Sequence, residues 1–232
     1  MWFFRFLTSS IGKKWIMAVS GLLLLLFLFG HIAGNTTLYL GSAAFQDYAE
    51  QLHSHMLFLS IFKIGLFSLF VIHISTGLFL FYQNRKARPV PYRISVRVAS
   101  NSIDDVCAKA IPGANGWISL PFAARTMPYS GLLILSFIII HLFGFSFGPQ
   151  DVPIAKTVIT LLGSPGYGLL YIFSFSVVAI HIHHGIWSLL QTLGLSHPRY
   201  SSFIARMTTI VPIFFLIVAG GIPLLLIFGV EF

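Results

Sequence analysis

Charged residues are scarce in this sequence. Asp, Glu, Lys and Arg make up 9% of the 232 residues, whereas hydrophobic residues make up 56%. With a mean hydropathy of +0.88, the chain is too apolar to fold as a soluble globule. The single cysteine, Cys107, excludes a disulfide framework, a CxxCH haem attachment and a cysteine-ligated iron–sulfur cluster built by this chain alone. The composition therefore predicts an integral membrane protein.

Acidic residues are the rarest charged type, with 6 Asp and Glu against 14 Lys and Arg and a net charge of +8. The basic residues lie in connections between apolar runs, so membrane topology explains them better than a nucleic-acid partner does. No carboxylate lies deep inside an apolar run, although proton relays across membranes commonly use such groups.

Five apolar segments are long enough to cross a bilayer as helices. They cover residues 14–36, 58–82, 127–147, 166–194 and 205–229. We expect one all-α transmembrane domain over residues 1–232, with an uncleaved first helix and a short amphipathic surface helix around Phe45 to Leu52. Residues 83–125 form the one long polar connection. The distribution of Lys and Arg places the N-terminus and this connection in the cytoplasm and the C-terminus outside.

The first part of the chain is repeated. Residues 17–34 match residues 127–144 at nine of eighteen positions, and residues 67–77 match residues 175–185 at six of eleven. The offsets are 110 and 108 residues. The repeat predicts that the first four helices form two parallel copies of one helical hairpin and that matching residues lie at matching depth.

Each predicted helix of the repeat carries one histidine at a matching position. With a rise of about 1.5 Å per residue, His31 and His141 share a layer near the outer face, and His73 and His181 share a layer nearer the cytoplasm. A glycine follows each histidine after one helical turn and is expected to leave room for a flat ligand: Gly34, Gly77, Gly144 and Gly185. Two facing imidazoles in each of two layers are what two six-coordinate haems require.

Other interpretations of these histidines remain open. Transmembrane histidines can simply form hydrogen bonds between helices, and a zinc site would need three or four ligands converging on one ion. His183 and His184 compete with His181 by spacing, although the repeat favours His181. Arg125, at the start of the third predicted helix, is a candidate partner for a haem propionate, but ordinary positive-inside placement also explains it.

Several of these residues together resemble one family, the single-chain di-haem cytochrome b subunit of succinate dehydrogenase and quinol:fumarate reductase. The similar elements cover four of the five predicted helices: Lys14-Trp15-x4-Ser20-Gly21, Gly30-His31, Ile72-His73, His141-Leu142 and His181-x3-Gly185-Ile186-Trp187-Ser188. The resemblance implies two haem b groups, with His73 and His181 binding the inner haem and His31 and His141 the outer one. Some members use a glutamate two residues before the fourth-helix ligand for proton movement, where this chain has Ala179.

The resemblance also implies partners and a location. A flavoprotein subunit and an iron–sulfur subunit are expected on the cytoplasmic face of a prokaryotic inner membrane, and they carry the dicarboxylate chemistry. Membrane quinone, expected to be menaquinone, is the substrate of this chain, and Glu50 and His53 are the candidate residues of its site. Two alternatives are the cytochrome b of another quinone-linked dehydrogenase, such as a hydrogenase or formate dehydrogenase, and a haem-free transporter.

Overall fold

A computed structural model describes residues 2–87, 120–145 and 151–232, and every secondary-structure element within these ranges is a helix. Five of the helices are long and apolar enough to cross a membrane, as the sequence predicted. These are α2 (Ser10–Asn35), α4 (Met56–Lys86), α6 (Leu120–Phe145), α8 (Pro165–Thr192) and α9 (Ser201–Ile227). The chain is therefore a multi-pass helical membrane protein.

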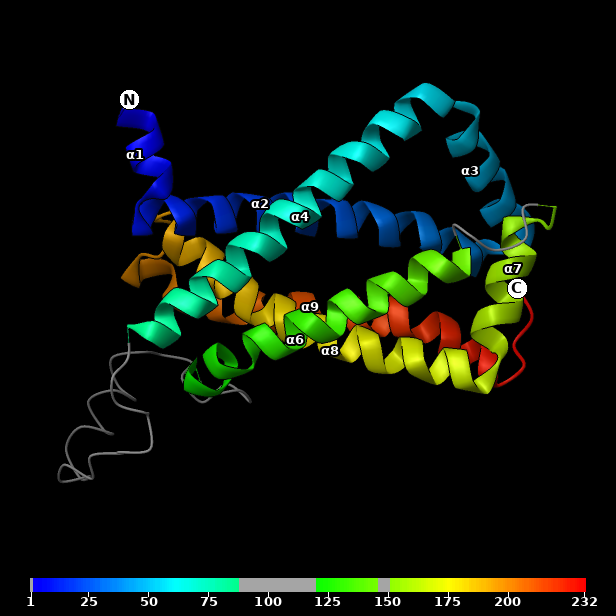
Figure 1. Cartoon of the computed structure of the whole chain (residues 1–232). Coiled ribbons are helices and arrows are strands. Elements are labelled where there is room, and N and C mark those ends of the chain that lie inside the picture. The colour runs from blue at the N-terminus through cyan, green and yellow to red at the C-terminus, as the bar shows by residue number, and fades with distance from the viewer. Residues whose placement is uncertain (1, 88–119, 146–150) are drawn as a thin grey trace, which may run out of the picture.

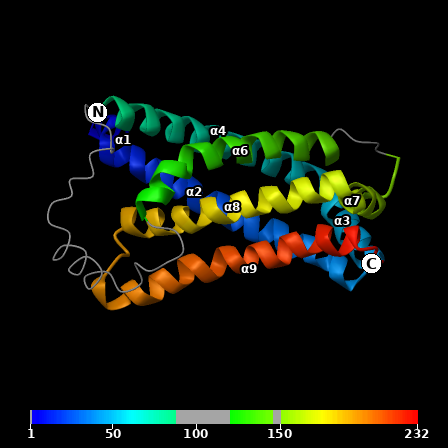
Figure 2. The ribbon, with the colours of Figure 1, turned by 90° about the horizontal axis from the view of Figure 1, so that it is seen from below.

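The long helices alternate in direction. Helices α2, α6 and α9 run away from the end of the molecule that holds the N-terminus, and α4 and α8 run back toward it (Figures 1 and 2). Helix α8 packs against α9, α6 and α2, whereas α4 packs mainly against α2. No residue of α4 is buried, and the N-terminal half of this helix leans away from the other helices (Figure 1).

Short helices cover the end of the bundle that lies farther from the N-terminus (Figure 1). They are η1 (Thr36–Leu40), α3 (Ser42–Ser54) and α7 (Ile154–Gly163). Helix α3 is the predicted amphipathic helix, and its Phe45 and Ala49 are buried. A positive φ of 116° at Gly41, which glycine adopts without steric cost, lets the chain turn from η1 into α3. We call η1, α3 and α7 the cap.

The sequence analysis missed α7 and two further short elements, α1 (Trp2–Thr8) and η2 (Pro198–Tyr200). Helix α7 buries Ala155, Val158 and Leu162, which lie three and four residues apart on one helical face. A helix of this length is too short to cross a bilayer, so a search for spanning segments passes over it.

Buried residues concentrate in two clusters. One joins the cap to α8 and α9 and consists of Leu38, Phe45, Ala155, Val158, Leu162, Tyr171, Ile222 and Leu226. The other lies between α8 and α9 and consists of Val178, Ile182, Phe215 and Ala219. The helices of the first cluster are therefore fixed by packing at the capped end, which is where the predicted outer histidines lie.

Candidate cofactor site

The structure brings His31 of α2 and His141 of α6 together. Their ring centres are 5.9 Å apart, and the ring planes are nearly perpendicular at 87°. Two metal–nitrogen bonds of about 2 Å, plus the distance from each nitrogen to its ring centre, place two imidazoles on one metal about 6 Å apart. The observed separation is compatible with two histidines that bind one metal, and it also lies within the usual range for two aromatic rings in edge-to-face contact.

Aromatic rings surround this pair. Phe27 stacks on His31 with ring centres 5.5 Å apart, and Phe145 lies 5.2 Å from His141. His141 Nδ1 lies 3.0 Å from the hydroxyl of Tyr171, which is only 3% exposed and belongs to the core cluster at the cap. Within the described ranges, the His31 ring has no hydrogen-bond partner. An apolar, aromatic surrounding with a few polar contacts is typical of the lining of small-molecule sites.

The two inner histidines each meet a serine of the neighbouring helix. His73 Nδ1 of α4 lies 3.0 Å from Ser20 Oγ of α2, and His181 Nδ1 of α8 lies 3.0 Å from Ser130 Oγ of α6. Both serines are buried. The two rings therefore have closely similar surroundings.

Three of the four rings thus use Nδ1 in a contact to a hydroxyl oxygen, and no hydrogen bond to Nε2 of any of the four is found among the described residues. Histidines that bind metals commonly have this arrangement, in which a second residue holds one ring nitrogen and the other binds the metal. The described residues contain no group of three or more His, Cys, Asp or Glu side chains that could hold an ion together. His31 and His141 instead lie together as a pair.

The expected role of the four glycines after the histidines is wrong for two of them. The ring of Tyr48 lies directly against Gly34, and Met17 Cε lies 3.2 Å from where a Cβ of Gly77 would be. The space beside these glycines is filled by side chains from other parts of the chain, which the order of residues along one helix does not reveal. Gly144 has only ordinary contacts and Gly185 faces open space.

Two other glycines contact histidine rings. A Cβ on Gly21 would lie 3.3 Å from His73 Cε1, and a Cβ on Gly131 would lie 3.7 Å from His181 Cε1. The sequence analysis assigned these glycines no role. Their signal was present, because each directly follows a serine that recurs in the repeat.

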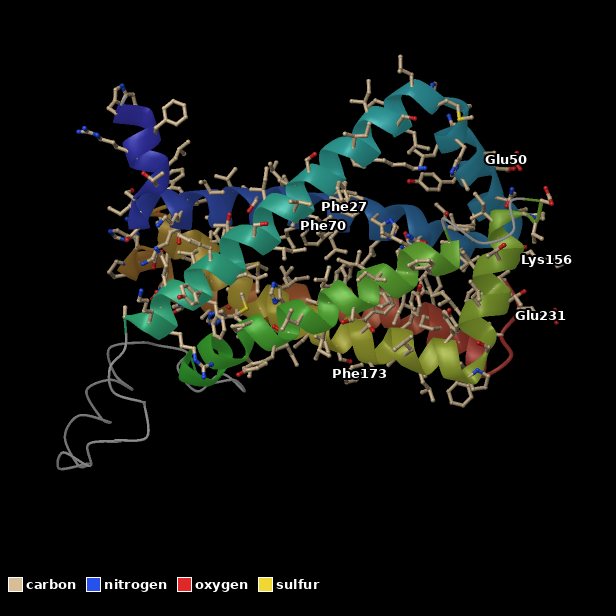
Figure 3. All side chains as sticks on the ribbon, in the orientation of Figure 1. Phe27, Glu50, Phe70, Lys156, Phe173 and Glu231 are labelled. Atoms are coloured by element: carbon tan, nitrogen blue, oxygen red, sulfur yellow. The ribbon has the colours of Figure 1, made fainter. Side chains whose placement is uncertain are left out.

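Of the remaining candidates, His183 lies on α8 two residues after His181, and Glu50 and His53 lie on α3. His183 Nδ1 is buried without a hydrogen-bond partner in the described ranges, unlike the Nδ1 of His181. Glu50 is exposed on α3, accepts a hydrogen bond from Gln46 and points away from the space between α2 and α4 (Figure 3). His53 Nδ1 lies 2.7 Å from the carbonyl oxygen of Ala49 in the preceding turn of α3. The side chain of Arg125 lies outside the described residues.

Comparison with family models, curated proteins and solved structures gives no match to this chain.

Proposed function

We propose that this chain is a di-haem cytochrome b that anchors a succinate dehydrogenase or fumarate reductase in the membrane and exchanges electrons with quinone. The observation that carries the proposal is the pairing of His31 with His141 at a ring separation of 5.9 Å, which is close to the spacing of two imidazoles that bind one metal. The matched Nδ1 contacts of His73 and His181 support a second site of the same kind.

In this proposal each residue has a defined task. His31 and His141 hold the outer haem through Nε2, and His73 and His181 hold the inner one. When bound, the two haems supply one-electron carriers at two depths of the membrane. Because two histidines would bind each haem iron, no coordination position would be left for substrate. The chain therefore conducts electrons, and the dicarboxylate reaction belongs to its partners.

The distribution of charge supports the proposed orientation. Seven of the nine Lys and Arg residues with described side chains lie toward the end with the N-terminus, and Lys63 and Lys156 lie toward the capped end. The seven are Arg5, Lys13, Lys14, Arg85, Lys86, Arg199 and Arg206. The four described carboxylates lie toward the opposite end: Asp47, Glu50, Asp151 and Glu231. By the positive-inside rule the basic end faces the cytoplasm of a prokaryotic cell. The flavoprotein and iron–sulfur subunits dock on this basic end.

Similar hydrogen bonds in the two halves of the chain support the proposed parallel repeat. Ser20 and His73 belong to the first copy and Ser130 and His181 to the second, and the two contacts have the same length. The quinone site is assigned to the capped end, near Glu50 and His53, where a quinol can exchange protons with the outside. Menaquinone is the proposed quinone.

The decisive experiment is a reduced-minus-oxidised optical spectrum of the purified chain, together with single replacements of the four histidines by alanine. We expect b-type bands from two haems. His31→Ala and His141→Ala should remove the same haem, and His73→Ala and His181→Ala the other. The exposed His55 is the matched control, and His55→Ala should leave both haems in place.

Each other outcome has a clear meaning. A wild-type protein without b-type bands would favour a haem-free transporter and end the proposal. Two haems together with a co-purifying metal–pterin or nickel subunit would instead assign the chain to a formate dehydrogenase or hydrogenase. A covalent-flavin subunit in the complex supports the succinate or fumarate enzyme.

A further inference from the structure

The contacts of Ser20 decide where the proton of His73 lies. Ser20 Oγ is 3.1 Å from the carbonyl oxygen of Met17 and 3.0 Å from His73 Nδ1. A carbonyl oxygen only accepts hydrogen bonds, and a serine hydroxyl has one proton to donate. Both contacts are therefore satisfied only when Ser20 donates to Met17 and His73 Nδ1–H donates to Ser20. The lone pair of His73 is then on Nε2.

The same arrangement occurs around His181. Ser130 Oγ is 3.0 Å from the carbonyl oxygen of Met127 and 3.0 Å from His181 Nδ1. All three residues of this group lie at positions that the sequence repeat equates with Met17, Ser20 and His73. Ser20 is 3% exposed and Ser130 is 7% exposed, so water does not compete freely for either hydroxyl. Both inner rings therefore carry the same tautomer.

The glycine after each serine sets the position of the ring. His73 Cε1 lies 3.3 Å from where a Cβ of Gly21 would be, closer than ordinary contacts, whereas the matching distance from Gly131 to His181 is 3.7 Å. The same Cβ position lies 3.7 Å from His73 Nδ1, so a side chain at Gly21 would push the edge of the ring that is formed by Cε1 and Nδ1. An alanine at Gly131 would meet its ring at an ordinary contact distance.

We propose that the dipeptides Ser20-Gly21 and Ser130-Gly131 are positioning elements for the inner haem, each of which orients a ligand histidine of the neighbouring helix. Serine fixes the proton on Nδ1 and directs the Nε2 lone pair to the metal, and glycine admits the ring against the helix backbone. This inference rests on the proposed function, because it assigns His73 and His181 to a haem. The serine and glycine act through the histidine and do not bind the haem iron themselves.

The test uses Ser20→Ala and Ser130→Ala in the full chain. Removing a residue that supports a metal-binding histidine typically lowers metal affinity by about 10-fold to 100-fold. We expect weaker binding of the inner haem in that range, an upward shift of its midpoint potential and a changed electron paramagnetic resonance spectrum. The hydrogen bond from Nδ1–H makes the imidazole a stronger electron donor to the iron. Without this bond the oxidised haem is less stabilised, so the midpoint potential should rise. The outer haem should keep its spectrum.

Ser20→Thr keeps the hydroxyl and should restore most of the inner haem binding. The matched control is Ser136 of α6, an exposed serine whose Oγ donates to the Leu132 carbonyl and meets no histidine. Ser136→Ala should change neither haem. Gly21→Ala should alter the resonance spectrum of the inner haem more than Gly131→Ala, because its contact is tighter.

A second measurement needs no haem. Nitrogen-15 chemical shifts of the histidine rings in haem-free protein report the tautomer directly, and we expect Nδ1–H for His73 in the wild type and a mixture in Ser20→Ala. If the wild type binds two haems but the serine variants match it in affinity, potential and tautomer, the positioning role is overturned and the proposed function stands. If the wild type binds no haem, the proposed function fails, and an unchanged tautomer in Ser20→Ala would overturn the serine's role as well.

Discussion

The two histidine pairs differ in what holds them. At the inner pair both rings have the same polar partner, a buried serine on the neighbouring helix at 3.0 Å. At the outer pair His141 contacts Tyr171, whereas no hydrogen-bond partner of the His31 ring is found in the described residues. The inner pair is thus symmetric and the outer pair is not.

The sequence repeat explains this difference. The alignment of residues 67–77 with 175–185 has an offset of 108 residues, and extending it by one helical turn places Lys63 opposite Tyr171. Lys63 is exposed, whereas Tyr171 is buried in the cluster that joins the cap to α8. The second copy of the repeat therefore has a tyrosine where the first has none. Both inner rings contact a serine of a neighbouring helix, whereas at the outer pair only His141 has such a partner in the described residues, a tyrosine that is packed against the cap.

Tyr171→Phe should have the largest effect, and this effect should fall on the outer pair alone. The change keeps the ring in the core but leaves His141 Nδ1 without its partner, which commonly costs about 10-fold or more in metal affinity. We expect the outer haem to bind more weakly and the inner haem to stay unchanged. Haem content at limiting haem, measured for each site by redox titration, checks this.

Tyr167 is the matched control for Tyr171. Its ring centre lies 6.4 Å from that of Tyr171 on the same helix, and no hydrogen bond of its hydroxyl is found in the described ranges. Tyr167→Phe should leave the outer haem unchanged. Equal losses from both variants would mean that the aromatic cluster, and not the hydrogen bond to His141, determines haem binding.

Changes at Glu50 and His53 should have smaller effects than the loss of Tyr171. Both residues are exposed on α3, and Glu50 already accepts a hydrogen bond from Gln46, whose carbonyl oxygen accepts from the backbone N–H of Ala155. We expect Glu50→Gln and His53→Gln to raise the KM for quinol severalfold and to leave both haem spectra unchanged. Steady-state quinol oxidation checks this, and an unchanged KM in both variants would remove the quinone site from α3.

The sequence allowed the pairing of His31 with His141 to be predicted because the two histidines occupy matching positions of the repeat. It aligned His31 with His141 and His73 with His181, and the structure brings the first of these pairs to 5.9 Å. Hydropathy identified the five long helices because each contains a long apolar run.

The rest depends on contacts between distant parts of the chain. Tyr48 fills the space beside Gly34, and Tyr171 reaches His141 from the next long helix, and neither contact leaves a periodic signal in the sequence. Ser20 and Gly21 were visible as repeated residues. Their relation to His73 required the packing of α2 against α4, which fixes the relative rotation of the two helices.

The smallest change is expected at His183, which tests whether the haem ligand is chosen by position in the repeat or by the local density of histidines. His183 Nδ1 is buried without a partner in the described ranges, whereas His181 Nδ1 meets Ser130. A buried polar atom without a partner costs about 1 to 3 kcal/mol, so an apolar residue at this position removes a penalty. His183→Leu should therefore keep both haems and leave thermal stability unchanged or raised.

His184→Leu should also keep both haems, while His181→Leu removes the inner one. If His183→Leu or His184→Leu lost a haem while His181→Leu kept both, the ligand would be His183 or His184. The two proposed inner ligands would then no longer occupy matching positions of the repeat.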